Sequence, residues 1–204
     1  MMLHGLRHGP PGPDCLHLCV DMQRLFGPGY TWSMAWFQRI LPAVTALVGH
    51  DPARTIFTRF IPPLTASDLP GSWQRYYRKW ERVTRSHLPD AALNLAPPLD
   101  AFVPPARIVD KMVYSPWFAP DLDRMIGRGR VDTLIVSGGE TDQCVLATVL
   151  GAVDRGFRVI LVSDALCSAS DETHDALMML YARRFDTQIE LATTAEVLAD
   201  WPRP

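Results

Sequence analysis

Three residues of this sequence have the types and the setting for nucleophilic chemistry: Cys144, Asp21 and Lys111. Cys144 follows the segment SGGETDQ and is expected to open a helix. The amino end of a helix carries partial positive charge and free backbone N–H groups, which favour a thiolate and could hold an oxyanion. Taken alone, a cysteine at such a position is more often a small buried helix residue.

The two partner residues each end an apolar strand candidate. Asp21 ends the run CLHLCV and could exchange a proton with the thiol, whereas Lys111, in VDKMVYSPWF, could favour the thiolate and hold the carboxylate. Taken singly, Asp21 could equally be a turn carboxylate and Lys111 a solvated lysine. The neighbouring Asp110 points to the opposite strand face, so only one of Asp110 and Lys111 is expected in the site.

The elements that must position these residues alternate along the chain. Short apolar runs predict strands at 15–20, 54–60, 107–109, 133–136, 158–162 and 187–191. Amphipathic runs predict helices from about residue 32 and at 72–85, 121–127, 144–155, 171–185 and 194–200. This alternation indicates an α/β fold with a parallel sheet covered on both faces and right-handed crossovers. Ligands of such sheets bind outside the carboxyl ends of the strands, where the three residues fall.

The composition is that of a single globular domain. The chain has 204 residues, of which 48 % are hydrophobic and 21 % charged, and its net charge is -2. We expect a flexible arm at 1–13 and one domain at 14–204, with the Pro-rich stretch 89–105 as a packed connection. The charge balance argues against nucleic acid and membrane surfaces as partners and favours a small molecule or another copy of the chain. No membrane span or signal peptide is apparent, so we expect a cytoplasmic protein.

The cysteines and glycines argue against a metal or cofactor. Free thiols are expected at Cys15, Cys19, Cys144 and Cys167, because a chain of this size folds without disulfides. No pair has CxxC spacing with a histidine at ligand distance, which argues against zinc. The glycines at 138–139 fit neither a dinucleotide fingerprint nor a phosphate loop, so no cofactor is expected.

The residues around Cys144 are those of a known family. VSGGETDQCVLATVLGAVDRGFRVILVSDALCS closely resembles the signature of the isochorismatase-like cysteine hydrolases. VDMQRLF at 20–26, FTR at 57–59 and DKMVYSPWFAPDLD at 110–123 resemble the family's first-strand, second-strand and lysine motifs. The resemblance covers roughly residues 15–198. It implies a three-layer α/β/α, Rossmann-like fold with a six-stranded, mostly parallel sheet.

The resemblance also implies roles for individual residues. It implies a catalytic triad of Asp21, Lys111 and Cys144, and a cis peptide bond between Gly139 and Glu140. That bond would turn the N–H of Glu140 toward the substrate beside the N–H of Cys144, and the two would form an oxyanion hole. Because members of the family often form dimers or tetramers, we expect a homodimer or homotetramer.

Two departures from the pattern of related enzymes narrow the chemistry. Nicotinamidases of this group resemble the rest but carry metal-binding histidines after the second strand, whereas this chain has no histidine between Arg59 and His87. Isochorismatases proper usually lack the cysteine, so Cys144 favours a substrate similar to those of N-carbamoylsarcosine amidase and the biuret and ureide hydrolases. We expect a cysteine-dependent amidohydrolase that cleaves a C–N bond through a thioester. An isochorismatase-type ether hydrolase and a catalytically inactive oligomeric binding module stay open as alternatives.

Four residues are candidates for binding the substrate. Phe26 follows Asp21 closely, and Trp117 and Phe118 follow the lysine motif, so all three could line a pocket. Arg59, at a strand end, could bind a substrate carboxylate or form a structural ion pair. The helix expected at 72–85 carries an aromatic stripe that we expect in the core or a subunit interface rather than the pocket: Trp73, Tyr76, Tyr77 and Trp80.

Overall fold

The computed structural model describes residues 5–127 and 131–203. Its centre is a six-stranded sheet in the order β3-β2-β1-β4-β5-β6, and every neighbouring pair of strands is parallel. The α/β fold with six strands is therefore confirmed, and the sheet is parallel throughout the part described. The strands are β1 (Leu16–Val20), β2 (Thr55–Phe60), β3 (Arg107–Lys111), β4 (Thr133–Gly139), β5 (Arg158–Cys167) and β6 (Ile189–Ala192).

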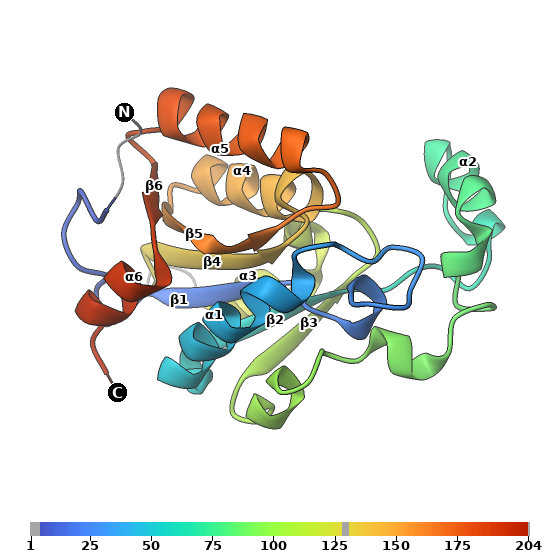
Figure 1. Ribbon diagram of the computed structural model, residues 1–204, viewed down its shortest axis with the longest axis horizontal. Coiled ribbons are helices and arrows are strands. Elements are labelled where there is room, and N and C mark those ends of the chain that lie inside the picture. The colour runs from blue at the N-terminus through green and yellow to red at the C-terminus, as the bar shows by residue number, and fades with distance from the viewer. Residues whose placement is uncertain (1–4, 128–130, 204) are drawn as a thin grey trace.

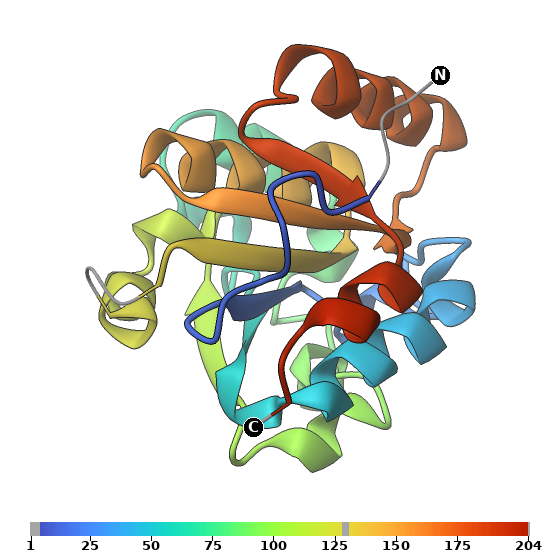
Figure 2. The ribbon, with the colours of Figure 1, turned by 90° about the vertical axis from the view of Figure 1, so that its left-hand side faces the viewer.

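Helices cover both faces of this sheet. The helices are α1 (Phe37–His50), α2 (Ser72–Lys79), α3 (Pro120–Ile126), α4 (Leu146–Asp154), α5 (Asp171–Arg184) and α6 (Thr194–Asp200). Helices α1 and α6 pack together on one face, α3 and α4 lie on the other, and α5 packs against β6 (Figures 1 and 2). This is the three-layer arrangement that the alternating pattern predicts.

Burial and capping explain where these elements form. Every residue of β1, β4 and β6 is buried, as expected for parallel strands that are covered on both faces. Helix α5 begins after Ser170, whose hydroxyl accepts a hydrogen bond from the Thr173 N–H. Helix α6 begins after Thr193, which forms a capping box with Glu196. These signals place the starts of both helices at the predicted residues.

Three helix boundaries differ from the expectation by more than one residue. Helix α1 begins at Phe37 rather than near residue 32, and α2 ends at Lys79, after which the chain continues as a 3₁₀ turn. Helix α4 begins at Leu146, because residues Thr141–Val145 form a π-helical turn. Cys144 therefore lies inside this turn and not in the first turn of a regular helix. Such π-helical turns are frequent at functional sites.

The Pro-rich stretch 89–105 is a packed connection, as predicted. It contains two short 3₁₀ helices, Asp90–Leu93 and Leu99–Phe102. Leu95 and Leu99 are buried in the core, and the Ala96 N–H donates a hydrogen bond to the Met22 carbonyl. These contacts tie the stretch to the segment that follows β1.

The described part of the amino-terminal arm lies along β6. The Gly5 N–H donates to the Leu191 carbonyl at 2.8 Å, and the Arg7 guanidinium donates to the Ile189 carbonyl at 3.0 Å. Residues 1–4 of the expected arm lie outside the described residues, and its flexibility stays a prediction. Across residues 5–127 and 131–203, no helix has the length and apolar character needed to cross a membrane.

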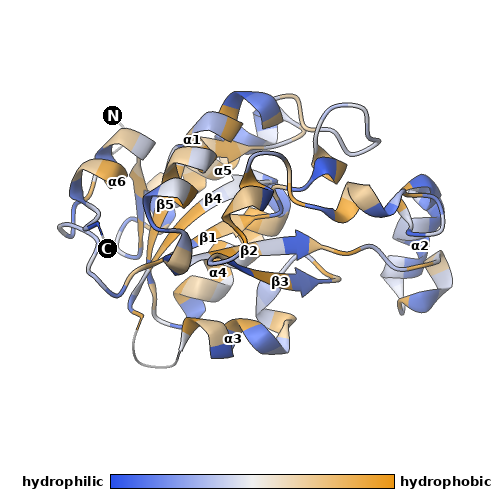
Figure 3. Ribbon diagram, turned by 90° about the horizontal axis from the view of Figure 1, so that it is seen from below, coloured by the Kyte–Doolittle hydropathy of each residue, from blue (hydrophilic) through white to orange (hydrophobic). Residues whose placement is uncertain are grey.

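Polar residues gather at one edge of the sheet. The centre of the sheet is hydrophobic, whereas the carboxyl ends of β2 and β3 are hydrophilic (Figure 3). Helix α2 lies beyond these ends, away from the other helices (Figures 1 and 3). The fold thus places the polar carboxyl ends of the strands next to α2, where sequence reasoning expects the site.

Candidate active site

The side chains of Asp21, Lys111 and Cys144 meet at the carboxyl ends of the strands. The Lys111 Nζ donates a hydrogen bond to Asp21 Oδ2 at 2.7 Å and to Cys144 Sγ at 3.2 Å. The three residues are nearly excluded from solvent, with exposures of 1, 3 and 7 % for Asp21, Lys111 and Cys144. Lys111 thus bridges the carboxylate and the thiol.

Asp21 is held in place through both its backbone and its carboxylate. Its φ of 50° lies in the left-handed region, which residues other than glycine rarely adopt and which is enriched at functional sites. The Thr58 hydroxyl donates to Asp21 Oδ1 at 2.6 Å, and the Asp21 N–H donates to the Thr58 carbonyl at 3.1 Å. Thr58 is a supporting residue that sequence reasoning missed. Its only signal is a polar side chain between Phe57 and Arg59 in a mostly apolar strand.

Lys111 is a buried ammonium stabilised by its neighbours. Burial lowers its pKa, but the charge of Asp21 and the hydrogen bonds to Asp21 and Cys144 outweigh burial, so the net pKa is raised. The Lys111 Nζ also lies 4.8 Å from the centre of the Phe60 ring, which adds a cation–π contact. Lys111 therefore stays protonated beside the thiol.

The Cys144 thiol is not pre-ionised. Burial raises its pKa well above the ordinary value; Lys111 lowers it, and the Asp21 carboxylate raises it again. The thiolate favoured by a helix amino end is therefore not the resting state, because the sulfur is buried and precedes α4. The Asp21 carboxylate and the Cys144 sulfur share the Lys111 ammonium, so a carboxylate that could accept a proton lies near the thiol.

This pKa predicts slow alkylation of Cys144 at neutral pH. Iodoacetamide should label it slowly at pH 7, and the rate should rise about tenfold per pH unit without a plateau up to pH 9, because only the thiolate reacts. Labelling of the native protein, resolved by peptide mass spectrometry, measures this rate, and the same peptide from unfolded protein is the control. A plateau near pH 7 would contradict the raised pKa.

The turn before Cys144 depends on a close approach of two strands. Gly138 has a φ of 108°, and a Cβ at this position would overlap the Val20 carbonyl oxygen of neighbouring β1. Only glycine fits this backbone and this approach. The following Gly139–Glu140 peptide bond is cis, as the family resemblance implies.

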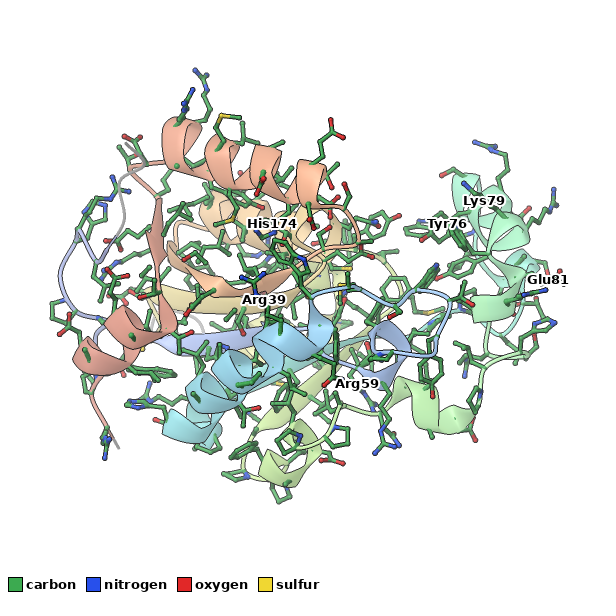
Figure 4. All side chains as sticks on the ribbon, in the orientation of Figure 1. Arg39, Arg59, Tyr76, Lys79, Glu81 and His174 are labelled. Atoms are coloured by element: carbon green, nitrogen blue, oxygen red, sulfur yellow. The ribbon has the colours of Figure 1, made fainter. Side chains whose placement is uncertain are left out.

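The first residue of the turn is anchored to neighbouring elements. The Thr141 hydroxyl donates to the Cys167 carbonyl at 3.1 Å and lies 2.9 Å from Nδ1 of His174 on α5. The His174 ring packs edge-on against Trp36, before α1 (Figure 4). These contacts fix the turn that carries Cys144 between α1, β5 and α5.

A pocket opens above Cys144. The pocket is narrow: the centres of water-sized molecules fit in about 20 Å³ of it, within about 290 Å³ of space that includes open solvent. Most of its wall is aromatic, and its lining residues are Phe26, Trp32, Phe60, Tyr76, Tyr114, Glu140, Gln143 and Cys144.

Comparison with known proteins places the chain. A family model described as the isochorismatase domain matches residues 15–195. The chain belongs to the isochorismatase family. A solved cysteine hydrolase from Pseudomonas syringae pv. phaseolicola 1448A is similar to it over 98 % of both chains, with a TM-score of 0.80 and 26 % identity. The family that the sequence motifs resemble, and its fold, are thereby confirmed.

Two sequence relatives match a shorter stretch of the chain. Maleamate amidohydrolase of Pseudomonas putida (strain KT2440) is 30 % identical over 69 residues, which is 34 % of this chain and 32 % of that protein. The uncharacterized isochorismatase family protein YwoC of Bacillus subtilis is 33 % identical over 70 residues, 34 % of this chain and 37 % of that protein. The chain thus matches only about a third of the length of these curated relatives.

Of the four predicted substrate-binding residues of this isochorismatase-family chain, only Phe26 lines the pocket. Arg59 instead forms an ion pair with Asp110, with N–O distances of 2.7 and 2.8 Å, which is the structural alternative. The Trp117 indole N–H donates to the Thr148 carbonyl at 2.8 Å, which packs the ring against α4. Phe118 is 81 % exposed and lies outside the lining. At the end of β2 it is instead Phe60 that lines the pocket.

One member of the aromatic stripe, Tyr76, contributes to the pocket, contrary to the expectation, whereas Tyr77 lies in the core, as expected. Tyr76 lines the pocket and lies between α2 and the rest of the protein, whereas Tyr77 is fully buried (Figure 4). Trp32 packs against Tyr76, Tyr77 and Trp80, with ring centroids 6.0 to 6.3 Å apart. Tyr76 reaches the pocket because α2 lies beyond the strand ends instead of on a sheet face.

The cysteines form no disulfide bonds among the described residues. All four cysteines are free thiols, as predicted: Cys15, Cys19, Cys144 and Cys167. In the described part of the chain, no three or more His, Cys, Asp or Glu side chains are grouped so that they could hold a metal ion. The side chains that meet at the site supply a thiol, a carboxylate and an ammonium.

Proposed function

We propose that this chain is a cysteine-dependent hydrolase of small amide, carbamoyl or ureide substrates, which cleaves a C–N bond and releases ammonia or an amine. The observation that carries the proposal is the buried contact of Lys111 with both Asp21 and Cys144, beneath a pocket that Cys144 lines. The similarity to a maleamate amidohydrolase and a cysteine hydrolase supports it. The expected homodimer or homotetramer stays a prediction.

The first half of the proposed reaction makes a thioester. Asp21 takes the proton of Cys144 as the sulfur attacks the carbonyl carbon, because the thiol is neutral at rest. Lys111 stabilises the negative charge that passes between the two residues. Asp21 then gives its proton to the nitrogen, the C–N bond breaks, and ammonia or an amine leaves.

The developing oxyanion needs hydrogen-bond donors on the pocket wall. We assign the backbone N–H groups of Glu140 and Cys144 to this role. The Glu140 N–H makes no hydrogen bond to any described residue, and Glu140 and Cys144 both line the pocket. One donor of this kind contributes roughly 10²- to 10³-fold to the rate of acyl transfer.

The second half of the reaction restores the thiol. Asp21 takes a proton from water, whose oxygen attacks the thioester carbonyl carbon. The C–S bond breaks, the proton returns to the sulfur, and the acid leaves the pocket. The Thr58 hydroxyl holds the Asp21 carboxylate toward the site through both halves.

An ammonia-release screen of small amides and ureides tests the proposal. For a turned-over substrate, quenched samples should carry an acyl adduct on the peptide that contains Cys144. Cys144→Ala should lower turnover at least about 10³-fold, because the nucleophile is lost. Cys15→Ala, which removes a thiol at the opposite end of β1, is the matched control and should retain turnover.

Activity measurements on Cys144→Ala and on the native protein also distinguish the proposal from its two alternatives. Hydrolysis of isochorismate that persists in Cys144→Ala would instead support an isochorismatase-type ether hydrolase. Absence of turnover for every amide, ureide and isochorismate tested would support a catalytically inactive binding module. Either result would refute the proposed thioester chemistry.

A further inference from the structure

Glu140 is the one acidic residue among the described residues that line the pocket above Cys144. Glu140 Oε2 accepts a hydrogen bond from the Ala169 N–H at 3.2 Å, while Oε1 makes no hydrogen bond to any described residue. Burial raises the pKa of Tyr76 and Tyr114, and the Glu140 charge raises both further. Glu140, Tyr76 and Tyr114 all line this pocket.

In the part of the chain that the structure describes, no positively charged side chain lines the pocket together with Glu140. The nearby Lys111 is already paired with Asp21 at 2.7 Å, and the described residues that line the pocket include no arginine and no lysine. Arg59, which the sequence suggested as a group that could bind a substrate carboxylate, is paired with Asp110 and does not line the pocket. A negatively charged group in the pocket would meet Glu140 without a compensating cation.

The aromatic side chains around Glu140 suit a positive group. Trp32 stacks on Phe26, with a centroid distance of 6.2 Å and an interplanar angle of 7°, and its ring centre lies 6.0 Å from that of Tyr76. The faces of such rings attract cations, and the attraction strengthens where water is excluded. Gln143 adds an amide to the lining that can accept an N–H hydrogen bond.

We propose that Glu140 and these aromatic side chains select substrates that carry a positive charge, such as an ammonium group, at the end remote from the scissile C–N bond. This inference rests on the proposed function and names its substrate class. Glu140 would then serve twice, with its backbone N–H at the oxyanion and its carboxylate at the remote charge. Amides with a remote carboxylate are the class that the pocket disfavours.

Three amides of matched length test this selection. β-Alaninamide carries an ammonium, butanamide is neutral, and succinamate carries a carboxylate. We expect kcat/KM for β-alaninamide to exceed that for butanamide about tenfold and that for succinamate by more. Glu140→Gln should reduce the ratio between β-alaninamide and butanamide to about one, because only the charge of the side chain is lost. Glu81→Gln, on the outer side of the 3₁₀ turn after α2, is the matched control and should keep the ratio (Figure 4).

Binding to the Cys144→Ala variant, measured by calorimetry, separates this inference from the proposed function. Tighter binding of β-alaninamide than of succinamate, lost in Cys144→Ala/Glu140→Gln, would support the selection even if the native protein hydrolysed no amide. Equal binding of the two compounds, tighter binding of succinamate, or no binding of either would overturn it. Hydrolysis of succinamate in preference to β-alaninamide would also overturn it while leaving the thioester chemistry in place.

Discussion

Asp21→Asn is expected to lower kcat/KM for the best amide substrate about 10³-fold. Asparagine keeps the shape of the side chain and can still accept the Thr58 hydrogen bond, but it cannot take the proton of a neutral thiol. General base catalysis of this kind contributes typically about 10²- to 10⁴-fold. Steady-state ammonia release at pH 7 measures the loss, and thermal unfolding checks that the variant is folded.

Asp110→Asn is the matched control for this variant. It removes a carboxylate at the same end of the sheet, one that pairs with Arg59 and lies outside the pocket lining. The control should change kcat/KM by less than about threefold, since exposed ion pairs contribute little. If Asp21→Asn retained a third of the native activity, Asp21 would not be the base, and the proposed proton transfers would be wrong.

Lys111→Met should produce the largest loss of stability among single substitutions at this site. It leaves the Asp21 carboxylate buried without its cation, and breaking a buried pair in this way typically costs about 3 to 5 kcal/mol in the free energy of unfolding. Urea unfolding at pH 7 measures this change. The paired variant Arg59→Met, which breaks the more exposed pair with Asp110, should cost about 1 kcal/mol or less.

A double-mutant cycle identifies the cause of that loss. If the cost comes from an uncompensated charge, Asp21→Asn/Lys111→Met should recover at least half of the stability lost in Lys111→Met. No recovery would mean that the loss comes from packing around the lysine stem. A loss below about 1 kcal/mol in Lys111→Met itself would argue against a buried charge pair.

Much of the fold could be predicted from local sequence signals. The apolar runs at β1, β4 and β5 are buried on both faces, so their composition alone identifies them as parallel strands. The caps at Ser170 and Thr193 act within one helical turn, so the starts of α5 and α6 could be predicted. The motifs around Asp21, Lys111 and Cys144 likewise point to residues that the sheet brings together.

The features that could not be predicted depend on contacts far apart in the chain. Tyr76 enters the pocket only because α2 lies beyond the strand ends, and no local pattern specifies that position. Arg59 is drawn to Asp110 across the β2–β3 pair, which leaves it outside the pocket. The raised pKa of Cys144 follows first from burial by the surrounding elements, whereas the sequence shows only its place near a helix start.

The amino-terminal arm has a consequence for how the protein behaves at high concentration. The carbonyl groups of Ile189 and Leu191 face away from β5, and in a bare edge strand they would invite a strand from another molecule. Here Arg7 and Gly5 already occupy them, and the Arg158 guanidinium holds the arm by donating to the Gly9 carbonyl at 2.6 Å. The arm therefore covers the outer carbonyl groups of β6. We expect that its removal would expose this edge strand, to which a strand of another chain could add.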